Sequence, residues 1–203
     1  MLQKYSDIEK ELKIKDKLLV NIIDSNVGEI TPHPSVDIYL DLLNSIVSQQ
    51  LSVTVAEIIW KRFLDLFPNQ YPEASQVLAF DISELRKVGL SNSKASYLQN
   101  VANFSLLNSM GYESLNKKND DEIIKFLTQI KGVGKWTVQM ILMFSMDRPD
   151  VFPVDDLGIQ NKMKAIYQLS DDKKELKQQM IIVSEKWRPY RTLASKHLWN
   201  YKL

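Results

Sequence analysis

The sequence predicts an all-α protein of about ten helices. Apolar residues recur at helical spacing through most of the 203 residues, and almost no run alternates apolar and polar residues as a half-buried strand would. Short stretches rich in proline or glycine, at 31–34, 69–72 and 132–134, separate these periodic segments. A content of 44% hydrophobic and 25% charged residues is typical of a globular chain with a buried core.

The helices are expected one after another along the chain. The first covers residues 6–24, where Ile8, Leu12 and Leu19 share a face. Ser52 is expected to cap the third helix, because serine favours the position before the first helical residue. The second and later expected helices cover, in order, residues 36–50, 53–67, 73–79, 82–87, 94–107, 123–127, 136–146, 156–167, 172–184 and 191–201.

Composition excludes several classes of protein. The net charge of +1 argues against a histone-like binder, although residues 185–203 carry five basic side chains against one acidic side chain. The absence of cysteine excludes disulfides and thiolate-ligated metal centres, and two histidines make a histidine-rich metal site improbable. No stretch is long and apolar enough to span a membrane, and residues 1–10 lack a signal-peptide pattern. We therefore expect a cytoplasmic protein without a membrane partner.

The chain is organised around residues 127–137, where two apolar helical segments meet at Gly132-Val133-Gly134. Glycine permits positive φ and close backbone approach, so this stretch predicts a very tight turn between helices. The N–H groups of Gly132, Gly134 and Lys135 would then point outward at the start of the second helix. Free N–H groups at a helix N-terminus bind anions, and a phosphate is the natural ligand.

A second motif follows at residues 151–159, where Pro153 precedes Asp155 and Asp156 at the start of the next expected helix. Together the two motifs resemble the helix-hairpin-helix DNA glycosylases of the HhH-GPD superfamily. The family hairpin reads hydrophobic, Pro, Gly, hydrophobic, Gly, two variable residues and Thr. Residues 130–137 match it, except that Lys131 replaces the proline.

The resemblance extends in order from about residue 36 to residue 201. Residues 45–52 are similar to an early helix that ends in Gln-Gln-Leu-Ser, and residues 89–98 resemble the segment before the hairpin. The closing stretch 187–199 is similar to that of the alkylated-base branch, the DNA-3-methyladenine glycosylase II type.

This resemblance implies two helical lobes with a DNA-binding cleft between them and the helix-hairpin-helix motif at about 123–146. Residues 36–150 would form the central lobe, and residues 1–35 with 151–203 the other. Some relatives carry an extra N-terminal sheet domain, which is expected to be absent because only about 30 residues precede the shared region.

The catalytic aspartate of the family corresponds to Asp156. Breaking an N-glycosidic bond makes the sugar strongly oxocarbenium-like, and a carboxylate near the anomeric carbon stabilises that positive charge. The helix dipole favours the ionised form of Asp156. The alternative is that this pair of aspartates only caps the helix, and we expect Asp155 to be the cap itself.

Family members that also cut the DNA backbone carry a lysine where this chain has Trp136. Tryptophan forms no Schiff base, so no AP-lyase activity is expected. The resemblance places Trp136, Met140 and Trp199 in the base pocket, where aromatic faces attract cationic methylated purines. Met140 departs from the aromatic pattern, which leaves the selectivity open. The alternative is that Trp136, Met140 and Phe144 are core residues.

Gln49 and Gln50, at a helix end, are candidates to fill the gap left by an extruded nucleotide, with Gln50 preferred. Thr137 completes the DNA-binding hairpin. In related hairpins the carbonyls at the positions of Thr128, Ile130 and Gly132 hold a monovalent cation that bridges to phosphate. No cofactor is expected to be required, although Na⁺ or K⁺ could bind at these carbonyls. His33 and His197 are assigned to structure.

The resulting prediction is a monomeric, monofunctional DNA glycosylase of base excision repair that binds double-stranded DNA. It would flip out alkylated purines such as 3-methyladenine and 7-methylguanine, and hydrolyse the N-glycosidic bond to leave an abasic site. Two alternatives are a helix-hairpin-helix glycosylase for another damaged base, and a non-catalytic DNA-binding protein on the same scaffold.

Overall fold

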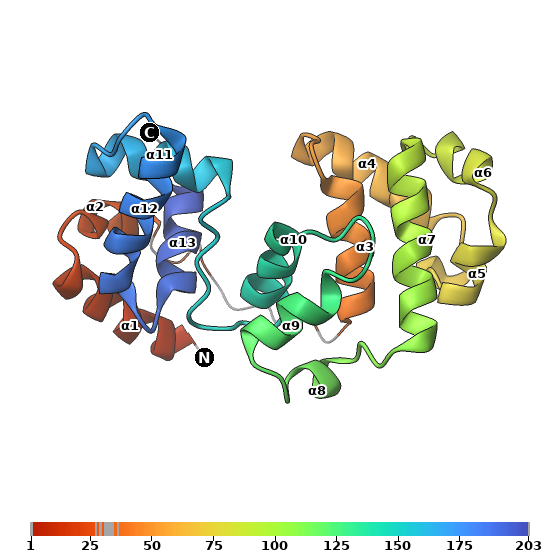
Figure 1. The fold of residues 1–203 in the computed structure, drawn as a ribbon, viewed down its shortest axis with the longest axis horizontal. Helices are drawn as coiled ribbons and strands as arrows, with labels where there is room; N and C mark the ends of the chain where they lie inside the picture. The colour runs from red at the N-terminus through yellow and green to blue at the C-terminus, as the bar shows by residue number, and fades with distance from the viewer. Residues whose placement is uncertain (1, 27, 29, 31–34, 36, 203) are drawn as a thin grey trace. The chain divides into compact units, whose positions relative to one another are not determined.

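The computed structural model describes residues 2–26, 28, 30, 35 and 37–202, and every regular element among them is helical (Figure 1). The predicted all-α class is therefore confirmed. The chain divides into two compact units, one formed by Met1–Pro34 with Leu142–Leu203 and the other by Ser35–Ile141. Residue 150, where the sequence placed a change of lobe, lies inside the first of these units.

The unit formed by residues 35–141 is built on the long helix α7, which packs against α3, α5 and α6 (Figure 1). Helix α3 also packs against α4 and α10, and α10 packs against α9. The elements of this unit are α3 (Ile38–Ser48), α4 (Val53–Leu64), η1 (Pro68–Gln70), α5 (Ala74–Ala79), α6 (Ile82–Lys87), α7 (Asn92–Leu107), α8 (Tyr112–Leu115), α9 (Asp120–Leu127) and α10 (Lys135–Met140).

Side-chain caps fix where these helices begin. The Asn119 side chain accepts from the Glu122 N–H at 2.9 Å, and the Glu122 carboxylate accepts from the Asn119 N–H at 2.8 Å. This reciprocal capping box satisfies two N–H groups that α9 leaves without helical partners. Ser91 caps α7 by accepting from the Lys94 N–H. Ser52 lies at the N-cap of α4 as expected, but its side chain makes no capping hydrogen bond.

The other unit combines the two ends of the chain. Its last helix, α13, packs against α1, α2 and α11. The elements are α1 (Leu2–Lys15), α2 (Leu19–Asp24), α11 (Leu157–Tyr167), α12 (Lys173–Ser184), η3 (Glu185–Trp187) and α13 (Arg191–Asn200). Trp187 is fully buried in the core of this unit, against Phe152 and Tyr167.

Asp16 explains why the first expected helix is two helices. Its Oδ1 accepts from the Leu18 N–H at 3.1 Å, and its Oδ2 accepts from Trp187 Nε1 and the Tyr167 hydroxyl, each at 2.9 Å. A buried carboxylate is stable only when its oxygens are paired, and here the paired groups lie far away in the sequence. The chain therefore breaks at Asp16 to bring the carboxylate to the core.

The second hairpin helix is not a regular α-helix over residues 136–146, as the sequence predicted. It begins as α10 and changes at residue 141 to a π-helical turn, η2 (Ile141–Ser145). After this turn Asp147 adopts a left-handed conformation, with φ of 49°, and the Arg148 N–H donates to the Leu142 carbonyl at 2.8 Å. A π-turn accommodates an extra residue, so it changes the direction in which the following side chains emerge.

None of the helices in the described part of the chain combines the length and apolar composition needed to cross a membrane.

His33 lies outside the described residues. His197 is fully buried on α13, where its Nε2 lies 3.1 Å from Glu9 Oε1. Asn26 fixes the same helix by donating to the His197 carbonyl at 3.0 Å.

Burial lowers the pKa of His197 to about 4, with a smaller contribution from the charge of Lys13. Among the described residues Nδ1 of His197 has no hydrogen-bond partner, so a second proton there would be a buried, unsatisfied donor. The neutral imidazole therefore donates from Nε2 to Glu9, and the contact is a hydrogen bond rather than an ion pair.

We predict that the free energy of unfolding falls by about 1–2 kcal/mol from pH 6.5 to pH 5 because of His197. The folded pKa lies below the ordinary 6.5, so the unfolded chain binds more protons in this interval. The contribution of the neutral His197 to the free energy of unfolding is complete above pH 6.5 and is lost as the pH falls towards 4. Urea unfolding of the parent and of His197→Gln across this interval measures it. An equal pH slope in the two proteins would contradict the neutral buried imidazole.

Candidate functional site

The hairpin between α9 and α10 is held by the close approach of Gly132 to the ring of Tyr97. Gly132 has a φ of +104°, and a Cβ on it would lie 2.2 Å from Tyr97 Cγ. The Val133 N–H donates to the Ile130 carbonyl at 3.0 Å and closes the turn. Only glycine fits this position, because a side chain would be strained by the backbone and would overlap the ring. The predicted tight turn is therefore present, and Tyr97 is its packing partner.

Gly134 differs from Gly132. Its φ is −93°, and a Cβ on it would meet no heavy atom within 4 Å. Gly134 is the N-cap of α10, so the N–H groups of the first turn lack partners within the helix. Lys135 is exposed beside it. The hairpin thus has the open backbone and the positive charge that an anion needs.

Gln49 and Gln50 lie beside the hairpin but in different environments. Gln49 is half-buried, and its Nε2 lies 3.4 Å from both the Gly132 carbonyl and Thr137 Oγ1. Bonds of this length are weak. The Thr137 side chain is itself buried, so it contacts Gln49 rather than solvent. Gln50 is exposed in a left-handed conformation, with φ of 58°.

A cavity of about 330 Å³ brings four of the predicted site residues together in this unit. Trp136 and Met140 line it from α10, and Gln49 and Gln50 line it from the segment after α3. Met140 is 8% exposed, and Trp136 is half-buried. Leu51, missed by the sequence analysis, lines the same cavity and is 37% exposed. The exposure of Leu51 and the left-handed φ of Gln50 are visible only in the structure, so the sequence offered no signal for this role.

Helix α7 contacts both chain segments that carry the lining residues of this cavity, the end of α3 and the hairpin. Lys94 Nζ donates to the Val47 carbonyl at 2.7 Å near the end of α3, and Asn100 Nδ2 donates to the Lys131 carbonyl at 3.0 Å. Tyr97 lies between them in sequence and packs on Gly132. The spacing of three residues places all three side chains on one face of the helix. The sequence analysis placed Lys94 and Tyr97 in a segment that resembles the family, but it gave none of the three residues a role, although their spacing was visible.

Asp156, and not Asp155, is the N-cap of α11. The Asp156 Oδ1 accepts from the Ile159 N–H at 2.8 Å, and the residue is 5% exposed. The expectation that Asp155 would cap was wrong, because the helix begins at Leu157. The Asp155 carboxylate instead pairs with Lys177 at 2.5 Å near the surface. One carboxylate oxygen of Asp156 is therefore held by the helix backbone.

Trp199 lies next to Asp156 within the same unit, and Gly158 makes this possible. A Cβ on Gly158 would lie 3.2 Å from both Asp156 Oδ1 and Trp199 Nε1. Lys162 donates to the Trp199 carbonyl. Burial lowers the pKa of Lys162, and the charge of Asp156 partly offsets this effect. Sequence reasoning missed Gly158 and Lys162; the glycine two residues after the aspartate was the available signal.

Phe144 stacks on Trp199, with ring centroids 5.3 Å apart and planes inclined by 33°. Phe144 is 38% exposed, so it is not an ordinary core residue. The structure therefore brings the predicted residues together in two groups, each within its own unit: Asp156 with Trp199, and Trp136 with Met140 and the two glutamines.

Backbone carbonyls of the hairpin were the predicted cation ligands. The Ile130 carbonyl accepts from the Val133 N–H, and the Gly132 carbonyl accepts weakly from Gln49. Each carbonyl oxygen has a second lone pair, so these bonds leave room for a cation. Within the described ranges, no three His, Asp or Glu side chains are grouped as a metal site would need.

The fold and these two groups of residues define a class of protein. Residues 43–189 match the family model of the HhH-GPD superfamily base excision DNA repair proteins. This match covers more than half of the chain, and the chain belongs to that superfamily.

Relatives within it are similar over most of the chain. DNA-3-methyladenine glycosylase 1 of Schizosaccharomyces pombe is 34% identical over 179 residues, which are 86% of this chain and 78% of that protein. YfjP of Bacillus subtilis is 34% identical over 169 residues, which are 80% of this chain but only 58% of that protein. The solved structure of the Schizosaccharomyces pombe 3-methyladenine DNA glycosylase with abasic DNA aligns with a TM-score of 0.84 at 31% identity, and the alignment covers 95% of each chain.

We predict that the two hairpin glycines differ in their effect on stability. Gly132→Ala should lower the free energy of unfolding by about 2–4 kcal/mol, because the new methyl group combines strain with overlap on Tyr97. Gly134→Ala should change it by less than about 1 kcal/mol, because its φ suits alanine and the space is open. Urea unfolding of both variants is the measurement, and equal losses would contradict this account of the turn.

Proposed function

We propose that this chain is a monofunctional DNA glycosylase that hydrolyses the N-glycosidic bond of alkylated purines, such as 3-methyladenine and 7-methylguanine, and leaves an abasic site. The observation that carries the proposal is Asp156, a buried carboxylate at the start of α11 with the Trp199 indole beside it. Membership of a base excision repair superfamily supports the same reaction. The names of the relatives support alkylated bases as the substrates.

In the proposed reaction Asp156 stabilises the positive sugar while the bond to the base breaks. Its Oδ1 is already held by the Ile159 N–H, so the carboxylate is preorganised and cannot rotate freely. A fixed charge near a developing charge is the most effective form of electrostatic catalysis. Water then adds to the anomeric carbon and loses a proton, and the base leaves from the Trp199 ring.

The hairpin and the segment after α3 would position the DNA. Backbone N–H groups at Gly134 and Lys135 would bind a phosphate, which fixes register without reading sequence. Gln50 and the exposed Leu51, which line the same cavity as Trp136, would enter the duplex in place of the extruded nucleotide. A Na⁺ or K⁺ ion on the carbonyls of Thr128, Ile130 and Gly132 would bridge to the same phosphate. We propose that the protein acts on double-stranded DNA as a monomer.

Two alternatives remain distinct from this proposal. A glycosylase for another damaged base is favoured by Met140, which gives the cavity a flexible thioether where an aromatic ring was expected. A binding protein without turnover is disfavoured by Asp156, because a buried carboxylate would only weaken the binding of an anionic duplex. The bases released from methylated DNA distinguish all three.

We predict that Asp156→Asn lowers the release of methylated bases by at least about 100-fold. Asparagine is as good a helix cap as aspartate, so the variant keeps the cap and loses only the charge. Binding to the duplex should be equal or tighter, because a repulsion with phosphate is removed. Incubation with methylated DNA, followed by chromatography of the released bases, is the measurement.

Asp155→Asn is the matched control, because it removes one charge near the surface from a pair with Lys177. Surface ion pairs contribute about 1 kcal/mol or less, so this variant should keep both its stability and its base release. If Asp156→Asn released bases at the parental rate, the catalytic assignment would be wrong.

We also predict that borohydride traps no covalent complex with damaged DNA. Reduction captures a Schiff base between a lysine and the opened sugar, and Trp136 occupies the position from which the family's lyases supply that lysine. Gel electrophoresis of labelled duplex after reduction is the assay. An adduct that mapped to Lys135 or Lys162 would contradict the monofunctional mechanism.

A further inference from the structure

Lys196 is a buried cation close to the Phe144 ring, which in turn contacts Trp199. The residue is 6% exposed, and its Nζ lies 5.1 Å from the centroid of the Phe144 ring. Burial lowers the pKa of Lys196, and the neighbouring Asp147 partly offsets this. A buried charge is costly, so its place close to the ring calls for a physical explanation.

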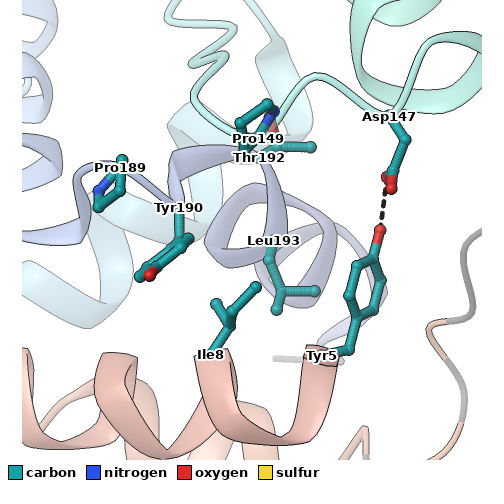
Figure 2. Close-up of a pocket in the computed structure, with 8 residues that line it drawn as sticks. All are labelled: Tyr5, Ile8, Asp147, Pro149, Pro189, Tyr190, Thr192 and Leu193. Atoms are coloured by element: carbon teal, nitrogen blue, oxygen red, sulfur yellow. Dashed lines mark hydrogen bonds between the residues drawn. The ribbon is translucent and has the colours of Figure 1, made fainter. Parts of the chain in front are cut away.

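Asp147 is the counter-charge of Lys196. Its Oδ1 lies 3.3 Å from Lys196 Nζ and accepts a hydrogen bond from the Tyr5 hydroxyl at 2.5 Å, which Figure 2 shows. The left-handed φ of Asp147 is uncommon for a residue other than glycine. The backbone therefore adopts a strained conformation at the residue that neutralises the lysine.

Solvent reaches this carboxylate from one side. A cavity of about 220 Å³ adjoins it, with Tyr5, Ile8, Leu193 and Tyr190 among its walls (Figure 2). The Asp147 side chain is 30% exposed, whereas that of Lys196 is 6% exposed. A polar replacement at residue 147 would therefore be hydrated through the cavity, and the buried lysine would keep its place.

We propose that Asp147 neutralises the buried Lys196, so that the lysine does not repel a positively charged base from Trp199. This inference rests on the proposed function, in which an alkylated purine stacks on Trp199. The field of Lys196 alone would repel a cationic base, and the field of Asp147 alone would attract it. With both present the two effects nearly cancel, and the π faces of the aromatic residues decide the preference.

The two charges can be removed separately, with opposite expected effects. At a separation on the order of 10 Å and an effective dielectric constant of about 20, one uncompensated charge changes affinity for a cation by about fifteenfold. Asp147→Asn should lower the preference for a cationic base by about that factor. Lys196→Met should raise it by a similar factor. The double variant should return to within about twofold of the parent.

The test compares two duplexes that differ in the charge of one base. One carries 2′-fluoro-7-methylguanosine, and the other carries 2′-fluoroguanosine at the same position. The fluorine destabilises the sugar cation and prevents cleavage, so both affinities can be measured at equilibrium. Titration at pH 6 keeps the methylated base cationic. The readout is the ratio of the two dissociation constants, which cancels changes in duplex binding common to both.

Tyr5→Phe is the control, because it removes the hydrogen bond to Asp147 without changing any charge. It should leave the ratio unchanged. Lys196→Arg keeps the charge and should also leave the ratio unchanged. Lys196→Gln removes the charge and replaces Lys196→Met if that variant fails to fold. Melting curves establish which variants are folded before titration.

Opposite shifts that cancel in the double variant would support the proposal. Shifts in the same direction, or a parental preference that neither substitution moves, would overturn it, since they are the results expected of a pair that only packs the helices. A parent that binds both duplexes equally would instead contradict the proposed function.

Discussion

The contact between the Gly132 backbone and the Tyr97 ring is the constraint around which the 35–141 unit is arranged. It sets how close α7 lies to the hairpin, and the neighbouring Asn100 holds the carbonyl of Lys131. The same face of α7 reaches the end of α3 through Lys94. A turn that binds phosphate through its backbone must be rigid, since loose N–H groups would lose their alignment with the anion. The aromatic ring supplies that rigidity from outside the turn.

In the other unit, the N-cap of α11 and the proposed catalytic group are the same residue, Asp156. Asp156 uses one oxygen to hold the first turn of α11, and Gly158 leaves room for the Trp199 indole beside it. Structural and chemical demands therefore act on one side chain, and few residues satisfy both. Asparagine meets the structural demand alone, so the two roles can be separated by experiment.

Local signals in the sequence were sufficient for most of the helices, the glycine hairpin and the aspartate motif, because spacing and cap residues act over a few positions. They failed where long-range contacts decide. Asp16 breaks the first helix to reach Trp187, a partner 171 residues away. The choice between Asp155 and Asp156 depended on which residue precedes the first helical one, and boundaries of helices are poorly specified by local pattern. The stack of Phe144 on Trp199 joins residues from separate helices, and no local pattern indicates it.

The π-helical turn at residues 141–145 has a consequence for how this fold can vary. Such a turn holds one more residue than the α-helix it interrupts. Loss of a single residue there would let a regular helix form, and the ring at position 144 would emerge on a different side, away from Trp199. The contact between Phe144 and Trp199 is thus sensitive to the length of the chain at residues 141–145 as well as to the two residue types. Insertion or deletion of one residue there would change this contact even though both aromatic residues were kept.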